Sequence, residues 1–185
     1  MNEVIANLAL EYMGHQKGEY QFCHPNDHVN RSQSTNDAYP SALKIAIYER
    51  LSNLVAPMKA LRDAFAQKAK EFAHVIKMGR TQLQDAVPMT LGQEFETYAL
   101  MVDRDIEQVL DARNWVRELN LGGTAIGTGI NSHPDYRSLI EKKIQEVTGR
   151  PFVMANNLIE ATQSTGAYVQ VLSLIHISDG AREAC

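Results

Sequence analysis

The sequence lacks the features that would place the protein in a membrane, on nucleic acid or in a disulfide-stabilised fold. It has two cysteines in 185 residues, Cys23 and Cys185, and they form no CxxC or zinc-binding spacing. No stretch approaches the about 18–20 uninterrupted apolar residues of a membrane-spanning helix, and no signal peptide is recognisable. The formal net charge of −4 gives no electrostatic basis for binding nucleic acid. We therefore expect a cytoplasmic protein without disulfides and without a membrane or nucleic-acid partner.

The apolar pattern favours an all-α fold. Apolar residues recur at three- and four-residue steps over Ala42–Phe72 and again over Leu91–Leu119. Both runs are longer than the usual helix of about three turns, which favours a bundle of long antiparallel helices. Pro57 predicts a kink or a break in the first run. Shorter helices are expected over 136–147 and over 156–168, and no series of strands is expected.

The first of three polar segments, "CHPNDHVNRSQSTND" (23–37), precedes the first long helix. Ser34 and Asp37 have the spacing of a capping box, and Pro40 suits an early helical turn. A single cap contributes about 1 kcal/mol and needs one such side chain, whereas residues 32–37 are all short and polar or carry an amide. They also suit a seat for a carboxylate or phosphate at the helix start. Local chemistry leaves both interpretations open.

The other two polar segments join or follow the long helices. In "KMGRTQLQDAVPMT" (77–90), Thr90 and Gln93 predict a second capping box. The same segment holds more polar groups than a connector needs, namely Arg80, Thr81, Gln82, Gln84 and Asp85. The glycines of "NLGGTAIGTGINSHPDY" (120–136) indicate tight backbone near a packing surface or a ligand.

The histidines and lysines give weaker signals. His24, Asp27 and His28 lie within five residues, but their spacing matches no defined metal motif, so a surface loop is the preferred interpretation. No metal and no cofactor are therefore predicted. His15, His74 and His133 are expected to be ordinary structural or surface residues. Lys17 and Lys44 are expected to be solvated charges.

Several composite motifs, in order along the chain, resemble those of the aspartase and fumarase superfamily. They are "NEVIAN" (2–7), "GHQKGEYQ" (14–21), "HPNDHVNRSQSTNDAYP" (24–40), "KMGRTQLQDAVPMTLGQE" (77–94), "LGGTAIGTGIN" (121–131) and "EVTGRPF" (146–152). The resemblance covers residues 2 to 170. It implies the long helices of a central bundle within a homotetramer, with active sites where segments from different subunits meet.

The resemblance also implies roles for particular residues, with a small dicarboxylate as the substrate. A seat for a substrate carboxylate is implied at Ser34, Thr35 and Asn36. Further substrate contacts, made from another subunit, are implied at Thr81 and Gln82. A secondary anion site is implied at His24, Pro25, Asn26 and Asp27. The family's serine base lies in a "GSSxMPxKxNP" signature that these 185 residues do not contain, so no catalytic residue is assigned here.

The chemistry implied is removal of a proton beside a carboxylate, followed by loss of a leaving group to give fumarate. The segments "STND" (34–37) and "GRTQLQDAVP" (79–88) favour loss of ammonia from L-aspartate over loss of water from malate. Ammonia leaves without help, whereas a hydroxyl leaving group needs a proton that Gln82 cannot supply. Two alternatives remain open: a class II fumarase, and a non-catalytic helical oligomerisation module derived from the lyase fold.

The resemblance further predicts how the chain is divided. Residues 1–171 are expected to form a partial lyase domain, comprising the end of the N-terminal region and the first part of the central helical bundle. Residues 172–185 resemble translated adapter sequence and are expected to be non-native. We expect such a fragment to be inactive alone.

Overall fold

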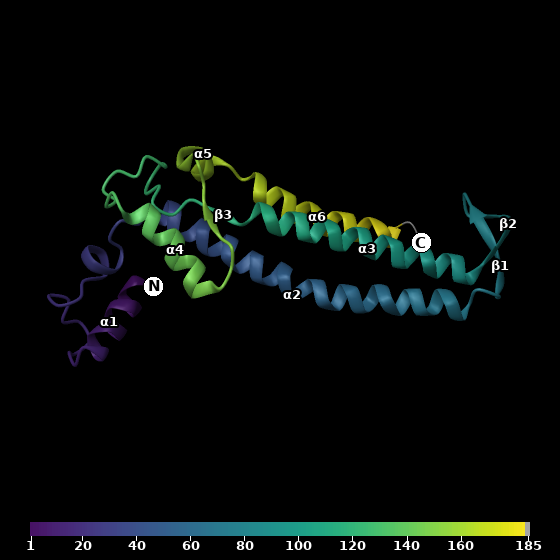
Figure 1. Cartoon of the computed structure of the whole chain (residues 1–185), viewed down its shortest axis with the longest axis horizontal. Coiled ribbons are helices and arrows are strands. Elements are labelled where there is room, and N and C mark those ends of the chain that lie inside the picture. Colours follow the sequence, from purple (N-terminus) through teal and green to yellow (C-terminus); the bar gives the residue numbers. More distant parts are fainter. Residues whose placement is uncertain (184–185) are drawn as a thin grey trace. The chain divides into compact units, whose positions relative to one another are not determined.

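The computed structural model describes residues 1–183 and divides the chain into two compact units (Figure 1). The first unit comprises Met1–Lys44 and Arg117–Ser164, and the second comprises Ile45–Val116 and the chain from Thr165 onward. The all-α expectation is confirmed, because helices are the main secondary structure of the chain and the strands are few and short. Cys185 lies outside the described residues. None of the described helices is long and apolar enough to cross a membrane.

The second unit is built on two long antiparallel helices, α2 (Thr35–Glu71) and α3 (Leu91–Trp115), of which α2 begins in the first unit. A third helix, α6 (Gly166–Glu183), lies along α3 (Figure 1). The apolar core between these helices consists of Ile47, Leu51, Val55, Met58, Val109, Ala112, Val171 and Leu174. These positions carry the helical periodicity of the sequence, and the prediction of two long helices is therefore confirmed.

Two boundaries of the predicted helices differ from the structure. A kink or a break was predicted at Pro57, and because helix α2 continues past this residue, there is no break. Pro57 and Asn53 are exposed, and water can bond to the Asn53 carbonyl that loses its helical partner. The single helix expected over 156–168 is instead two, α5 (Leu158–Gln163) and α6, separated where Ser164 takes an extended conformation.

A β-hairpin occupies the segment that was expected to be an irregular connector. Strands β1 (Ile76–Thr81) and β2 (Gln84–Thr90) pair antiparallel, from Ile76 opposite Thr90 to Thr81 opposite Gln84. The turn residues Gln82 and Leu83 have φ angles of 51° and 62°. This is a two-residue turn of the kind that favours asparagine and glycine. Because neither residue stands here, the sequence carries no hairpin signal.

The first unit combines the beginning of α2 with several short elements. These are α1 (Asn2–Tyr12), the π-helical turn η1 (Pro25–Val29), α4 (Tyr136–Thr148), α5, and the parallel pair β3 (Glu118–Leu119) and β4 (Val153–Met154). Helix α4 confirms the helix expected over 136–147. The buried polar and charged side chains of the described residues all belong to this unit: Asp37, Ser41, Lys44, Asn120 and Thr124.

Lys44 is one of these buried residues, so the prediction that it is a solvated charge is wrong. Its side chain is 6% exposed, and its Nζ donates a hydrogen bond to the Glu118 carbonyl oxygen at 2.7 Å. Residue 44 of α2 reaches β3 through this bond, a contact that the local apolar pattern does not encode. Burial lowers the pKa of Lys44, against the opposing effect of Glu118 and Glu160. Lys17, in contrast, is exposed as predicted.

Lys44 makes stability depend on pH in a defined direction. Its ordinary pKa is 10.5 in the unfolded chain and is lower in the folded chain. Between these two values the unfolded state binds more protons, so the free energy of unfolding rises with pH. Lys44→Met should remove that rise. Urea denaturation of both proteins at several pH values up to about 10.5 checks this. If the free energy of unfolding depends on pH in the same way for the unaltered protein and for Lys44→Met, the charge of Lys44 is not destabilising in the folded state.

Candidate functional site

The start of α2 has the capping geometry predicted from the sequence. The Ser34 Oγ accepts a hydrogen bond from the Asn36 N–H at 3.3 Å, and the Ser34 N–H donates to the Asp37 Oδ1 at 2.7 Å. Ser34 is therefore the N-cap, and Asp37 reaches back to its backbone. The Ser34 Oγ acts as an acceptor in this cap, which leaves its hydroxyl proton able to bond to a ligand.

Asp37 also binds the glycine-rich segment, a role that sequence analysis missed. Its carboxylate is fully buried, and Oδ2 accepts hydrogen bonds from the Thr124 N–H at 2.9 Å and the Gly122 N–H at 3.2 Å. One carboxylate therefore fixes the helix start and a loop far along the chain. The spacing of Ser34 and Asp37 indicated the cap, but nothing in the sequence indicated that Asp37 also bonds to the glycine-rich segment.

Asn36 and Asn120 add a second connection between the same segments. Pro40 has no amide hydrogen, so the Asn36 carbonyl lacks its usual helical donor. The Asn120 Nδ2 donates to that carbonyl at 3.0 Å, and its Oδ1 accepts from the Ser41 hydroxyl at 3.2 Å. The Asn36 Nδ2 donates to the Ala125 carbonyl at 2.7 Å. Asn36 is thus fixed at both its backbone and its side chain.

Ser34, Thr124 and Ala125, which these connections join, line a cavity of about 690 Å³ within the first unit. The lining comes from two segments and consists of Asn26, Asp27, Asn30, Arg31, Ser32, Gln33, Ser34, Thr124, Ala125, Ile126, Thr128, Ile130 and Asn131. Eight of these thirteen residues carry an amide or a hydroxyl, and the two charged residues are of opposite sign, although more of the exposed cavity surface is apolar than polar. Such a lining suits an anion held mainly by neutral donors.

The cavity brings together part of the predicted site. Ser34 of the carboxylate seat lines the same space as Asn26 and Asp27 of the secondary anion site. Thr35 and Asn36 are exposed beside it but are not part of its lining. Arg31, which sequence analysis did not select, contributes a positive charge. Arg31 could have been selected from the sequence, because this cationic residue lies between the two predicted anion-binding segments, 24–27 and 34–36.

His24 and Pro25 have a structural role at the start of η1. The His24 Nδ1 accepts hydrogen bonds from the Asn26 and Asp27 N–H groups, both at 3.2 Å, and Pro25 is buried. Within the described part of the chain, no group of three or more histidine, cysteine, aspartate or glutamate side chains could hold a metal ion.

Thr81 and Gln82 lie in the second unit, at the turn of the β1–β2 hairpin. Both are exposed, and Gln82 is one of the two turn residues with a positive φ. Arg80 and Asp85 form an exposed ion pair across the hairpin at 3.3 Å. The hairpin therefore presents the polar side chains of the "GRTQLQD" segment to solvent.

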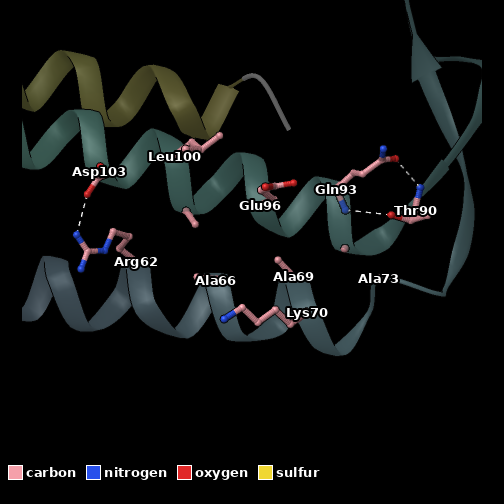
Figure 2. A pocket seen from close by; sticks show the side chains of 12 residues that line it. Arg62, Ala66, Ala69, Lys70, Ala73, Thr90, Gln93, Glu96, Leu100 and Asp103 are labelled. Atoms are coloured by element: carbon pink, nitrogen blue, oxygen red, sulfur yellow. Dashed lines mark hydrogen bonds and ion pairs between the residues drawn. The ribbon is translucent and has the colours of Figure 1, made fainter.

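A second hollow, between α2 and α3, is a packing groove and carries no cluster of reactive groups (Figure 2). Its cation Arg62 pairs with Asp103 at 2.8 Å, and Thr90 and Gln93 bond to each other in the predicted capping box. A Cβ added at Gly92 would lie 2.5 Å from the Ala69 carbonyl oxygen. Small residues here allow the two helices to approach closely.

Comparison with protein families defines the class of this protein. A family model described as "Lyase" matches residues 1–178, and the chain belongs to this lyase family. It is 98% identical over 175 residues to an aspartate ammonia-lyase of Helicobacter pylori, covering 95% of the chain and 37% of that relative. An aspartate ammonia-lyase of Escherichia coli is 55% identical over 170 residues, covering 92% of the chain and 36% of the relative.

Solved structures agree with this assignment. A Brucella melitensis protein described as fumarate lyase:delta crystallin, bound to cobalt, matches with a TM-score of 0.89 and 47% identity, over 94% of this chain and 38% of that one. A class II fumarase from Schistosoma mansoni matches with a TM-score of 0.90 and 30% identity, over 97% of this chain and 41% of that one. The resemblance to the aspartase and fumarase superfamily is confirmed. The chain spans little more than a third of the length of these relatives.

Proposed function

We propose that this chain contributes the carboxylate-binding part of an aspartate ammonia-lyase, which eliminates ammonia reversibly from L-aspartate to give fumarate. The observation that carries this proposal is the cavity in which Ser34, at the capped start of α2, meets neutral donors of the glycine-rich segment. The names of the relatives at 98% and 55% identity support the choice of reaction.

The chemistry requires donors that are fixed before the reaction begins. Removal of a proton from the carbon beside a carboxylate pushes a second negative charge onto that carboxylate, giving an aci-carboxylate. A well-placed donor aimed at the developing charge contributes about 3–4 kcal/mol. The Ser34 hydroxyl and the second N–H of the Asn36 amide can serve in this way, because neither has to change its protonation state. Thr35 is exposed beside them at the first turn of α2.

The remaining parts of the site come from elsewhere in this proposal. Thr81 and Gln82, on the exposed hairpin turn, approach the substrate of another subunit in a homotetramer. His24, Pro25, Asn26 and Asp27 form the secondary anion site, of which Asn26 and Asp27 line the same cavity as Ser34. The serine base belongs to a segment outside these 185 residues, and the assembled enzyme is cytoplasmic.

A class II fumarase is the second candidate, because one such enzyme matches the fold with a TM-score of 0.90. The two reactions can be separated by grafting this chain's sequence into the Helicobacter relative over their 175 shared residues. The graft should release fumarate from L-aspartate and form little malate from fumarate. The isolated chain should do neither, because it holds no candidate base.

Rapid malate formation by the graft would support the fumarase instead. Loss of both reactions in a correctly folded graft would favour a non-catalytic oligomerisation module. Fumarate release by the isolated chain would contradict the assignment of the base to another segment.

A further inference from the structure

Backbone conformations that non-glycine residues rarely adopt are concentrated around the candidate site. Among the described residues, five non-glycine residues have a positive φ. Ser32, Thr124 and Asn131 line the cavity, and Gln82 and Leu83 form the hairpin turn. Such conformations persist only where the surrounding structure enforces them, and they cluster at functional sites.

Thr124 is the most unusual of the three cavity residues. Asparagine tolerates the left-handed region through local hydrogen bonds, whereas a β-branched residue is an outlier there. Thr124 has a φ of 55°, a conformation that a glycine would adopt without strain. The chain has a glycine at the neighbouring position 123 but a threonine here. A threonine side chain at this position is therefore unfavourable for the local backbone.

Asp37 holds Thr124 in this conformation. The Thr124 N–H donates to the Asp37 Oδ2 at 2.9 Å, and the Ser34 N–H donates to the Oδ1 of the same carboxylate at 2.7 Å. The backbones of Thr124 and Ser34 are thus within hydrogen-bonding distance of one group. Because that carboxylate is fully buried, water does not compete for these bonds.

The Thr124 side chain is 8% exposed and lies in the wall of the cavity that also contains Ser34. Its hydroxyl has no hydrogen-bond partner within the described part of the chain. Among the described residues, the fully buried side-chain atoms without a partner are Gln108 Oε1, Arg113 Nε and Tyr136 Oη, so the Thr124 hydroxyl keeps some contact with solvent and is open to a ligand. A ligand oxygen in the cavity would supply that partner.

We propose that Thr124 is a further substrate-binding residue, whose hydroxyl donates to a carboxylate of the dicarboxylate substrate opposite Ser34, and that Asp37 is its positioning residue. This inference rests on the proposed function of the cavity and adds a donor from the glycine-rich segment. It also accounts for a threonine in a left-handed conformation, because the glycine that this backbone favours would have no hydroxyl.

Two substitutions separate binding from structure. Thr124→Val keeps the shape and the β-branched backbone preference but removes the hydroxyl. Thr124→Gly removes the hydroxyl and also relieves the strain, so it should keep or raise the denaturation midpoint. Both should weaken fumarate binding to the chain by about tenfold to a hundredfold, the effect of losing one hydrogen bond to a charged group. Thr124→Ser should retain most of the affinity.

Fumarate binding is measured by NMR titration of the 185-residue chain and each variant, with urea denaturation alongside. Thr97→Val is the matched control, because the Thr97 hydroxyl bonds within α3 to the Gln93 carbonyl, outside the cavity. It should leave binding unchanged. If Ser34→Ala weakens binding while both Thr124 variants bind normally, Thr124 is not a substrate ligand and the proposed function survives. If the unaltered chain binds no fumarate, both proposals are overturned.

Discussion

Gly127→Ala should lower the free energy of unfolding by about 3 kcal/mol or more, the largest effect expected for a single added methyl group in this chain. A Cβ built on Gly127 would lie 2.3 Å from the Ile159 Cα and 2.4 Å from the Leu158 carbonyl oxygen. Both obstacles are backbone atoms, which cannot rotate away. The φ of 91° at this residue is also unfavourable for alanine.

Gly149→Ala is the matched control for the conformational part of this effect. Gly149 ends α4 with a φ of 63°, and no atom lies within 4 Å of the position of an added Cβ. This variant should therefore lose only about 1 kcal/mol. Chemical denaturation of the two variants measures the difference. Equal losses would mean that the glycine-rich segment does not pack against α5 as described.

Ser34→Ala should reduce the kcat/KM for L-aspartate by about a hundredfold to a thousandfold in the Helicobacter relative grafted with this sequence, as expected for loss of one donor to a developing oxyanion. The substitution removes a hydroxyl at the cavity while leaving the Asp37 carboxylate and the Asn36 amide in place. Steady-state rates of fumarate formation provide the measurement.

The N-cap lost with Ser34 needs its own control, since a missing cap costs about 1 kcal/mol. Thr90→Ala removes the N-cap of α3, whose side chain accepts from the Gln93 N–H at 3.2 Å. This variant should lose similar stability and keep its kcat/KM. A comparable loss of activity in Thr90→Ala would show that helix capping, and not a substrate contact, explains the effect at Ser34.

Long helices could be predicted from the sequence because their apolar positions repeat within a few residues of one another. The core residues Leu51 and Val109 are examples. The hairpin could not be predicted from the sequence, because its turn residues Gln82 and Leu83 are not typical of a tight turn. The burial of Lys44 was also missed, because its hydrogen-bond partner, the Glu118 carbonyl, lies 74 positions further along the chain.

The candidate site was predictable only in part. The cluster of short polar residues around Ser34 was visible in the sequence, and it correctly indicated a capped helix start. The contact between Asp37 and Thr124 joins residues 87 positions apart. No local spacing encodes such a pair, so the role of Asp37 beyond capping required the fold. The glycine-rich segment did indicate tight packing, and the close approach of Gly127 to the backbone of Ile159 confirms this prediction.

The central claim is that the cavity beside Ser34 binds a dicarboxylate, and NMR titration of the chain with fumarate tests it most directly. The account predicts saturable shifts of the backbone amides of Ser34, Thr124 and Ala125, with succinate competing and a monocarboxylate such as acetate binding much more weakly. Shifts confined to other surfaces, or none at all, would contradict it.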